Sequence, residues 1–158
     1  MSTNQDFTRE DNSGNDRPIG PFDLSVNFQL SDQQVNQLSP SALAYLGDAV
    51  YELYIRSIYL LPPKRQHRYH QEVVTQVRAE TQAAHLRSLQ PDLTEMEQDV
   101  IRRGRNAASN RPKRVSAAIY QQATSLEALI GYLYLTDRDR LTDLLSKLYP
   151  SLNDKFKF

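Results

Sequence analysis

The chain has 158 residues, enough for one domain with a hydrophobic core but too few for two domains of ordinary size. It has no cysteine, which excludes disulfides, thiol catalysis and zinc bound by cysteine. Its 19 basic and 19 acidic side chains cancel, so net charge alone predicts no partner, and no apolar run approaches the roughly 20 residues that cross a bilayer.

The N-terminal segment differs in composition from the rest of the chain. Residues 1–32 hold six acidic side chains and two arginines among polar residues, so they bury too little apolar surface to offset the entropy of ordering. We predict an acidic disordered tail over 1–31, one domain over 32–150 and a C-terminal tail over 151–158. Because the polar N-terminus shows no signal-peptide pattern, we expect a cytoplasmic location and no membrane association.

Prolines divide the body of the chain into segments of helical character. Ser39 and Pro40 are typical of an N-cap and a first helical residue, which predicts a helix to about Leu60. After the pair Pro62–Pro63, apolar residues at helical spacing predict a further helical stretch, straight or kinked, to about Leu89.

Three more helices are expected in the second half. Thr94 and Glu97 form a capping-box pattern that opens a shorter helix through residues 100 and 101. Residues 115–135 are apolar on nearly every face, which is typical of a central buried helix, and leucines at helical spacing over 141–148 predict a last amphipathic helix. No strand or hairpin pattern is found, so the predicted fold class is all-α.

Two glycines lie inside predicted helices, Gly47 in AYLGDAVYE and Gly131 in LEALIGYLYL. A glycine in mid-helix costs about 1 kcal/mol relative to alanine, and close approach of another backbone is the usual reason for one. If the two helices cross at these glycines, the neighbouring carboxylates of Asp48 and Glu127 converge in a sheltered pocket. Converging carboxylates are the ligands that Mg²⁺ prefers.

A plainer interpretation stands beside this one. Asp48 lies four residues before Glu52 and eight before Arg56, so it can head a solvated stripe of charges, and Glu127 can be a polar position at the edge of its helix. From the residues alone this interpretation is favoured, because charge stripes are common and acidic metal pockets are rare.

The segment from Val100 to Arg114 carries six basic residues and no acidic one. We interpret it as a flexible, arginine-rich loop that follows a nucleic-acid backbone, since the planar guanidinium suits phosphate. The alternative is a solubilising loop that balances the acidic residues 95, 97 and 99. The candidate RNA-binding residues are Arg102, Arg103, Arg105, Asn106, Arg111, Lys113 and Arg114.

Four tyrosines lie on the first long helix, which predicts that they serve in the core or at a subunit interface. This helix is apolar on most sides, which raises the expectation of a dimer seam that includes Tyr45.

Together, AYLGDAVYE and SLEALIGYLYL resemble the two active-site motifs of the ribonuclease III endonuclease domain, a leucine-glycine-aspartate helix and a later glutamate-alanine-x-isoleucine-glycine helix. The intervening RRGRNAASNRPKR and a length that leaves no room for a C-terminal double-stranded-RNA-binding domain narrow the resemblance to the Mini-ribonuclease III group. It covers roughly Leu38 to Tyr149.

The resemblance implies an all-helical homodimer with two active sites in one cleft for double-stranded RNA. It further implies Mg²⁺-dependent hydrolysis that leaves 5′-phosphate and 3′-hydroxyl ends, and maturation of precursors of 23S (large-subunit) ribosomal RNA. By the same resemblance, Asp48 and Glu127 are the catalytic and metal-binding carboxylates. The family usually has two further carboxylates, where this chain has Ala44 and Thr124. A metal with more water ligands and a need for high Mg²⁺ are therefore expected.

Two other functions remain open from the sequence. Loss of two carboxylates is compatible with a catalytically silent RNA-binding or ribosome-assembly factor on the same fold. A helical protein–protein adaptor that docks through the tyrosine-rich helix is the second alternative.

Overall fold

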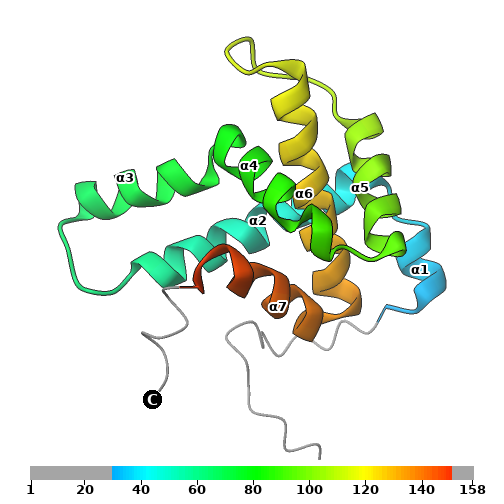
Figure 1. The fold of residues 1–158 in the computed structure, drawn as a ribbon, viewed down its shortest axis with the longest axis horizontal. Helices are drawn as coiled ribbons and strands as arrows, with labels where there is room; N and C mark the ends of the chain where they lie inside the picture. Colours follow the sequence, from blue (N-terminus) through cyan, green and yellow to red (C-terminus); the bar gives the residue numbers. More distant parts are fainter. Residues whose placement is uncertain (1–29, 151–158) are drawn as a thin grey trace, which may run out of the picture.

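Helices joined by short loops account for nearly all of residues 30–150, which are the residues that the computed structural model describes (Figure 1). This part of the chain contains no strand, so the all-α prediction is confirmed. Of the predicted tails, 1–31 and 151–158, all but residues 30 and 31 lie outside the described residues. The elements are α1 Asp32–Asn36, α2 Pro40–Tyr59, α3 Gln66–Val77, α4 Ala79–Leu89, the 3₁₀ turn η1 Gln90–Asp92, α5 Glu95–Ala107, α6 Ala117–Thr136 and α7 Arg138–Leu148.

The helix starts that were predicted from capping residues are confirmed. The Ser39 hydroxyl accepts a hydrogen bond from the amide of Ala42 at 3.1 Å, one residue before Pro40 begins α2. At the start of α5 the Glu97 amide donates to Thr94 Oγ1 at 3.2 Å, and the Thr94 amide donates to Glu97 Oε2 at 2.8 Å. These local bonds satisfy amides that the first turn of a helix leaves unpaired. The short helix α1, capped by Ser31, was not expected.

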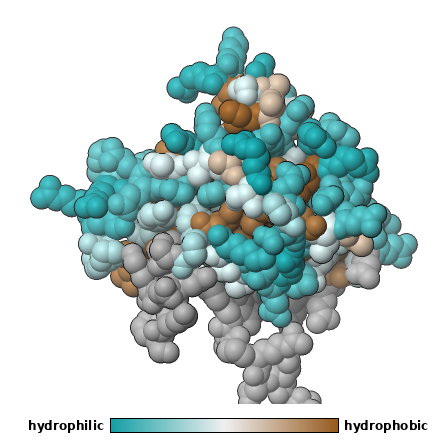
Figure 2. Space-filling view, viewed as in Figure 1, coloured by the Kyte–Doolittle hydropathy of each residue, from teal (hydrophilic) through white to brown (hydrophobic). Residues whose placement is uncertain are grey.

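The stretch between residues 64 and 89 is two helices, not one. Arg78 adopts an extended conformation, with φ −66° and ψ 153°, and separates α3 from α4. In Figure 1, α3 and the end of α2 project to the left as an arm, while α4 turns back across α6. The face in Figure 2 is mainly hydrophilic, including the side chains over this arm.

Helix α6 lies at the centre and packs against α2, α4 and α5. Its apolar surroundings confirm the prediction of a central buried helix, with Leu126, Leu129 and Ile130 almost fully buried. Tyr51 and Ile55 of α2 are completely buried in the same core. No helix within residues 30–150 combines the length and apolar character needed to span a membrane.

The backbones of α2 and α6 are in close contact where the two helices cross. A Cβ atom on Gly47 would lie 1.7 Å from the backbone oxygen of Glu127, and one on Gly131 would lie 2.0 Å from the backbone oxygen of Leu43. Neither position can carry a side chain at this helix separation. The predicted crossing at the two glycines is confirmed.

The basic segment differs from its prediction as a flexible loop. Helix α5 continues to Ala107, so Arg102, Arg103, Arg105 and Asn106 are helical and only the residues after 107 form a loop. The helix continues because its Gly104 packs against α6, where a Cβ would lie 2.9 Å from that of Ala128. Tertiary packing thus offsets the low helix propensity of glycine.

Candidate active site

Asp48 and Glu127 line one cavity of about 280 Å³, although 78 residues separate them in the sequence. The N-terminal half of α2 forms one wall with Ser41, Ala44, Tyr45 and Asp48, and α6 forms another with Tyr120, Thr124 and Glu127. The third wall is the end of α5 and the start of the following loop, residues 107–110. The structure therefore brings together the two carboxylates that the sequence singles out.

The glycine crossing explains why these side chains meet. Asp48 directly follows Gly47, and the backbone oxygen of Glu127 is the atom nearest to a side chain at position 47. Contact between the two backbones leaves adjacent side chains of both helices on the same flank of the crossing. The crossing of the two main chains thus places both residues at the same cavity.

The electrostatics of the pair are unfavourable without a cation. Burial, and secondly the negative charge of Asp48, raise the pKa of Glu127 from 4.5 to about 7, against a smaller lowering by a hydrogen bond from Gln82. Burial and the charge of Glu52 raise the pKa of Asp48 as well. Ordinary surface carboxylates show no such shift, whereas like charges that share a sheltered site do.

The donor set of the cavity fits a hard divalent cation. Within residues 30–150, neither Asp48 nor Glu127 has a basic side chain within ion-pair distance, so the pair lacks a counter-charge from the protein. The same part of the chain has no cluster of three or more His, Asp or Glu side chains that could hold a metal. Asp48 and Glu127 are the acidic side chains that line the cavity, and the other oxygen donors, such as the hydroxyl of Thr124, are neutral. This set suits Mg²⁺ because the ion keeps several water ligands.

The loop beside the carboxylates is held in a defined shape. The Tyr120 hydroxyl donates to the backbone oxygen of Ser109 at 2.8 Å, which ties the loop to α6. Asn110 has φ 58°, a left-handed conformation that asparagine tolerates better than most residues. Arg111 Nη1 donates to the backbone oxygen of Val115 at 2.9 Å and closes the loop.

The candidate RNA-binding residues divide into two groups. Arg111, Lys113 and Arg114 are exposed on the loop that lines the carboxylate cavity. Arg102 and Arg103 instead pair with Asp99 on their own helix, as the charge-balancing alternative proposes.

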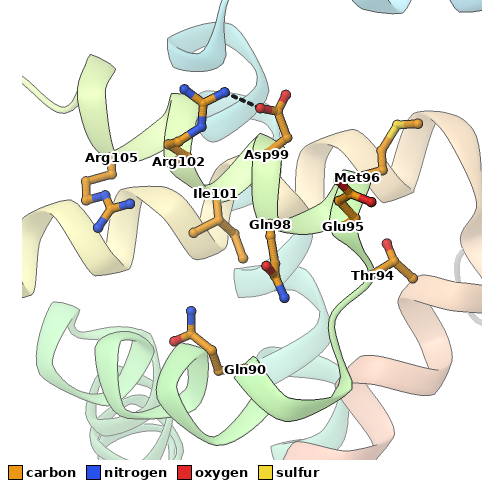
Figure 3. Close-up of a pocket in the computed structure, with 9 residues that line it drawn as sticks. All are labelled: Gln90, Thr94, Glu95, Met96, Gln98, Asp99, Ile101, Arg102 and Arg105. Atoms are coloured by element: carbon orange, nitrogen blue, oxygen red, sulfur yellow. Dashed lines mark hydrogen bonds and ion pairs between the residues drawn. The ribbon is translucent and has the colours of Figure 1, made fainter.

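Arg102 and Arg105 also line a separate open groove of about 860 Å³ between α5 and the end of α4 (Figure 3). In Figure 3, Arg105 comes from α5 and Gln90 from the opposite wall, and neither catalytic candidate lines this groove. Arg102 and Arg105 therefore line a different hollow from the one that Asp48 and Glu127 line.

Two further residues, Tyr45 of α2 and Gln82 of α4, bear on the carboxylate pair. Tyr45 lines the cavity and yet is 86% exposed, the highest value of any large apolar side chain within residues 30–150. Gln82 of α4 slightly lowers the pKa of Glu127, an influence that sequence reasoning missed. No local signal marks Gln82, because a single polar residue in an amphipathic helix is unremarkable until the packing is known.

Comparison with known proteins agrees with this geometry. The family model described as Ribonuclease III domain matches residues 41–138. A protein named Mini-ribonuclease 3 from Thermosynechococcus vestitus is 55% identical over 113 residues, which cover 72% of this chain and 75% of that protein. A Mini-ribonuclease 3 from a Synechococcus strain is 55% identical over 125 residues and covers 79% and 91%. A crystal structure of a Fusobacterium nucleatum protein superposes with a TM-score of 0.68 at 29% identity and covers 72% of this chain and 95% of that one.

Proposed function

Because this chain belongs to the ribonuclease III family and is an RNA endoribonuclease of the Mini-ribonuclease 3 type, we propose that Asp48 and Glu127 are its catalytic, metal-binding carboxylates. One observation carries the proposal. Two carboxylates from distant parts of the sequence converge in one cavity without a cationic partner from residues 30–150. A protein gains no stability from such a pair, so a function at this site explains its presence.

The proposed cofactor is Mg²⁺, held by Asp48 and Glu127 together with water. When bound, it would supply charge neutralisation at the scissile phosphate and lower the pKa of a water molecule for hydrolysis. The two carboxylates would orient the ion, and the half-buried position of Glu127 limits the screening of its charge by bulk water. Hydrolysis of this type is proposed to leave 5′-phosphate and 3′-hydroxyl ends.

A high requirement for Mg²⁺ is part of the proposal. Ala44 and Thr124, which stand where the family usually has carboxylates, both line the cavity beside Asp48 and Glu127. Their positions offer a methyl group and one hydroxyl in place of two negative charges. A hard cation binds more weakly when fewer charged ligands hold it, so we expect weak binding of Mg²⁺ at this site.

Double-stranded RNA is the proposed substrate, with precursors of 23S ribosomal RNA as the natural source and the cytoplasm as the location. The exposed cations of Arg111, Lys113 and Arg114 lie on the loop that borders the cavity and are placed to hold phosphates next to the scissile bond. Contacts of this kind follow the shape and charge of an A-form duplex rather than its base edges. RNA affinity should therefore fall steeply with salt.

A homodimer is proposed on the exposed face of α2. Tyr45, Ala49 and Leu53 lie on one side of this helix and are open to solvent, and Tyr45 also borders the carboxylate cavity. A second copy on this face would bring two cavities to one surface for the duplex. Tyr45→Asp should dissociate the dimer in sedimentation velocity at micromolar concentration, whereas the control Val74→Asp on the arm should not. A monodisperse wild-type monomer would contradict the proposal.

The catalytic assignment is tested with duplex RNA. The wild type and the variants Asp48→Asn and Glu127→Gln are incubated with duplex RNA and Mg²⁺, and binding is measured separately by electrophoretic shift at low salt. The expected result is cleavage by the wild type alone and RNA binding by all three. Undiminished cleavage by either variant would refute the assignment, and binding without cleavage by the wild type would favour the silent RNA-binding factor.

A further inference from the structure

We propose that Tyr120 is a positioning residue that holds the cationic loop, residues 108–115, in register with the carboxylate pair, an inference that rests on the proposed function. Tyr120 is the fourth residue of α6 and lines the cavity that Asp48 and Glu127 also line. Its hydroxyl donates to the backbone oxygen of Ser109 at 2.8 Å. One side chain thus borders the cavity and binds the loop that carries the candidate RNA-binding cations.

The spacing of residues along α6 gives Tyr120 this position. Thr124 and Glu127 follow it by four and seven residues, so the three side chains lie on one face of the helix, and all three line the cavity. Seven residues of an α-helix span about 10 Å. Tyr120 therefore stands at the end of this face that is next to the loop, two turns before the Glu127 carboxylate.

Side chains anchor the loop on both sides. At the top of Figure 1 the loop projects beyond the packed helices between the end of α5 and the start of α6. Tyr120 holds the backbone of Ser109 on the α5 side, and Arg111 Nη1 donates to the backbone oxygen of Val115 at 2.9 Å on the α6 side. The exposed cations of residues 113 and 114 lie between these two anchors.

The charges at the tip of the loop are available for RNA. Within residues 30–150, neither Lys113 nor Arg114 has an ion-pair partner. Their attraction for phosphates depends on charge and persists when the loop moves. Alignment of the scissile phosphate with the carboxylates depends on where the cations stand, and small displacements lower the rate steeply. Loss of the Tyr120 anchor should therefore affect turnover more than RNA binding.

The test compares Tyr120→Phe with the matched control Tyr132→Phe in the full chain. Both tyrosines are half-buried residues of α6, and the Tyr132 hydroxyl donates to Met96 Sδ of α5 at 3.3 Å, away from the residues that line the carboxylate cavity. Steady-state cleavage of duplex RNA at saturating Mg²⁺ gives kcat and KM. Trypsin digestion without RNA measures opening of the loop, from the fragments cut after residues 113 and 114.

In Tyr120→Phe, kcat should fall about fivefold, which is the effect of one lost hydrogen bond, while KM for RNA stays within about twofold. Cutting after residues 113 and 114 should become about fivefold faster, because proteolysis follows the population of the open loop. Tyr132→Phe should stay within about twofold of the wild type in all three values. Equal changes in the two variants would overturn the inference, and so would a change in kcat or in proteolysis without the other.

Coupling between the anchor and a cation of the loop is a second test. Arg114→Gln should lower kcat about fivefold in the wild type and less than about twofold in Tyr120→Phe, because a released loop no longer holds this cation in place. Equal effects in the two backgrounds, or no effect in the wild type, would contradict the positioning role.

Asp48→Asn separates this inference from the proposed function. If Asp48→Asn cleaves RNA like the wild type, the catalytic assignment fails, and a role of Tyr120 in register with that pair fails with it. If Asp48→Asn abolishes cleavage while Tyr120→Phe matches Tyr132→Phe in kcat and in proteolysis, the catalytic assignment stands and only the role of Tyr120 is refuted.

Discussion

Glu127→Gln should abolish cleavage and, without metal, make the folded protein more stable. Burial and the charge of Asp48 raise the pKa of Glu127 from 4.5 to about 7, so the ionised carboxylate is unfavourable in the folded state. A shift of this size corresponds to about 3 kcal/mol. Partial exposure of the side chain screens the effect, and we expect a gain of about 2 kcal/mol in the free energy of unfolding at pH 8.

The sign of the pH dependence follows from proton binding. Above pH 7, Glu127 is ionised in both the folded and the unfolded chain, and the folded chain carries the full penalty. Between pH 7 and 4.5 the folded chain keeps a proton that the unfolded chain has released, so the penalty declines as the pH falls. Glutamine resembles the protonated carboxyl in shape. The advantage of Glu127→Gln should therefore shrink to under about 1 kcal/mol at pH 5.

Urea denaturation in the presence of EDTA measures both values. The wild type, Glu127→Gln and the control Glu80→Gln, which changes an exposed carboxylate of α4, are compared at pH 8 and pH 5. Addition of Mg²⁺ should stabilise the wild type and leave Glu127→Gln unchanged. The reasoning is refuted if Glu127→Gln is no more stable than the wild type at pH 8, or if its gain is the same at both pH values.

Three further outcomes are expected. The rate of cleavage at limiting Mg²⁺ should rise as the pH increases through about 7, because Glu127 must lose its proton to bind a cation. In pH profiles measured at two Mg²⁺ concentrations, the midpoint of this rise should lie at lower pH when Mg²⁺ is high. Gly47→Ala should lower the free energy of unfolding by more than about 3 kcal/mol or prevent folding, since its methyl group would lie 1.7 Å from a backbone oxygen. Gly104→Ala would meet a side-chain carbon at 2.9 Å and should lower the free energy of unfolding in urea by about 1–2 kcal/mol. Arg140→Met should lower the free energy of unfolding by about 3–5 kcal/mol in the same assay. The Arg140 guanidinium donates to both carboxylate oxygens of Glu97, at 2.7 and 3.0 Å, and its loss leaves a carboxylate that is only 4% exposed without this partner.

Features of the fold that depend on residues close together in the sequence were predictable from the sequence alone. Ser39 with Pro40, and Thr94 with Glu97, each satisfy backbone groups within one turn, so their patterns indicate helix starts without knowledge of the rest of the fold. The glycine crossing was predictable for a different reason. A mid-helix glycine lowers helix stability, and close packing against another backbone is the compensation that its position in an apolar helix indicates.

Features that depend on distant residues were not predictable. The break at Arg78 is stabilised in part by the Tyr51 hydroxyl, which binds a carbonyl 25 positions away in the sequence. The small influence of Gln82 on the pKa of Glu127 depends on the packing of α4 against α6, which no local pattern indicates. The length of α5 was underestimated because the glycine and arginines after residue 101 indicate a loop by composition, while packing of Gly104 against α6 keeps the segment helical.

The crossing of α2 and α6 also determines how the site can respond to the repulsion between its carboxylates. The two backbones are in contact at Gly47 and Gly131, so Asp48 and Glu127 cannot separate by a movement of either helix without loss of this packing. A proton on Glu127 instead relieves both the penalty of burial and the repulsion by Asp48, and the resulting pKa of about 7 places this change at physiological pH. If the pair binds a divalent cation as proposed, a proton and the cation compete for it. Below pH 7, metal binding must release this proton, and the apparent affinity for Mg²⁺ should fall up to about tenfold for each pH unit below the pKa of Glu127.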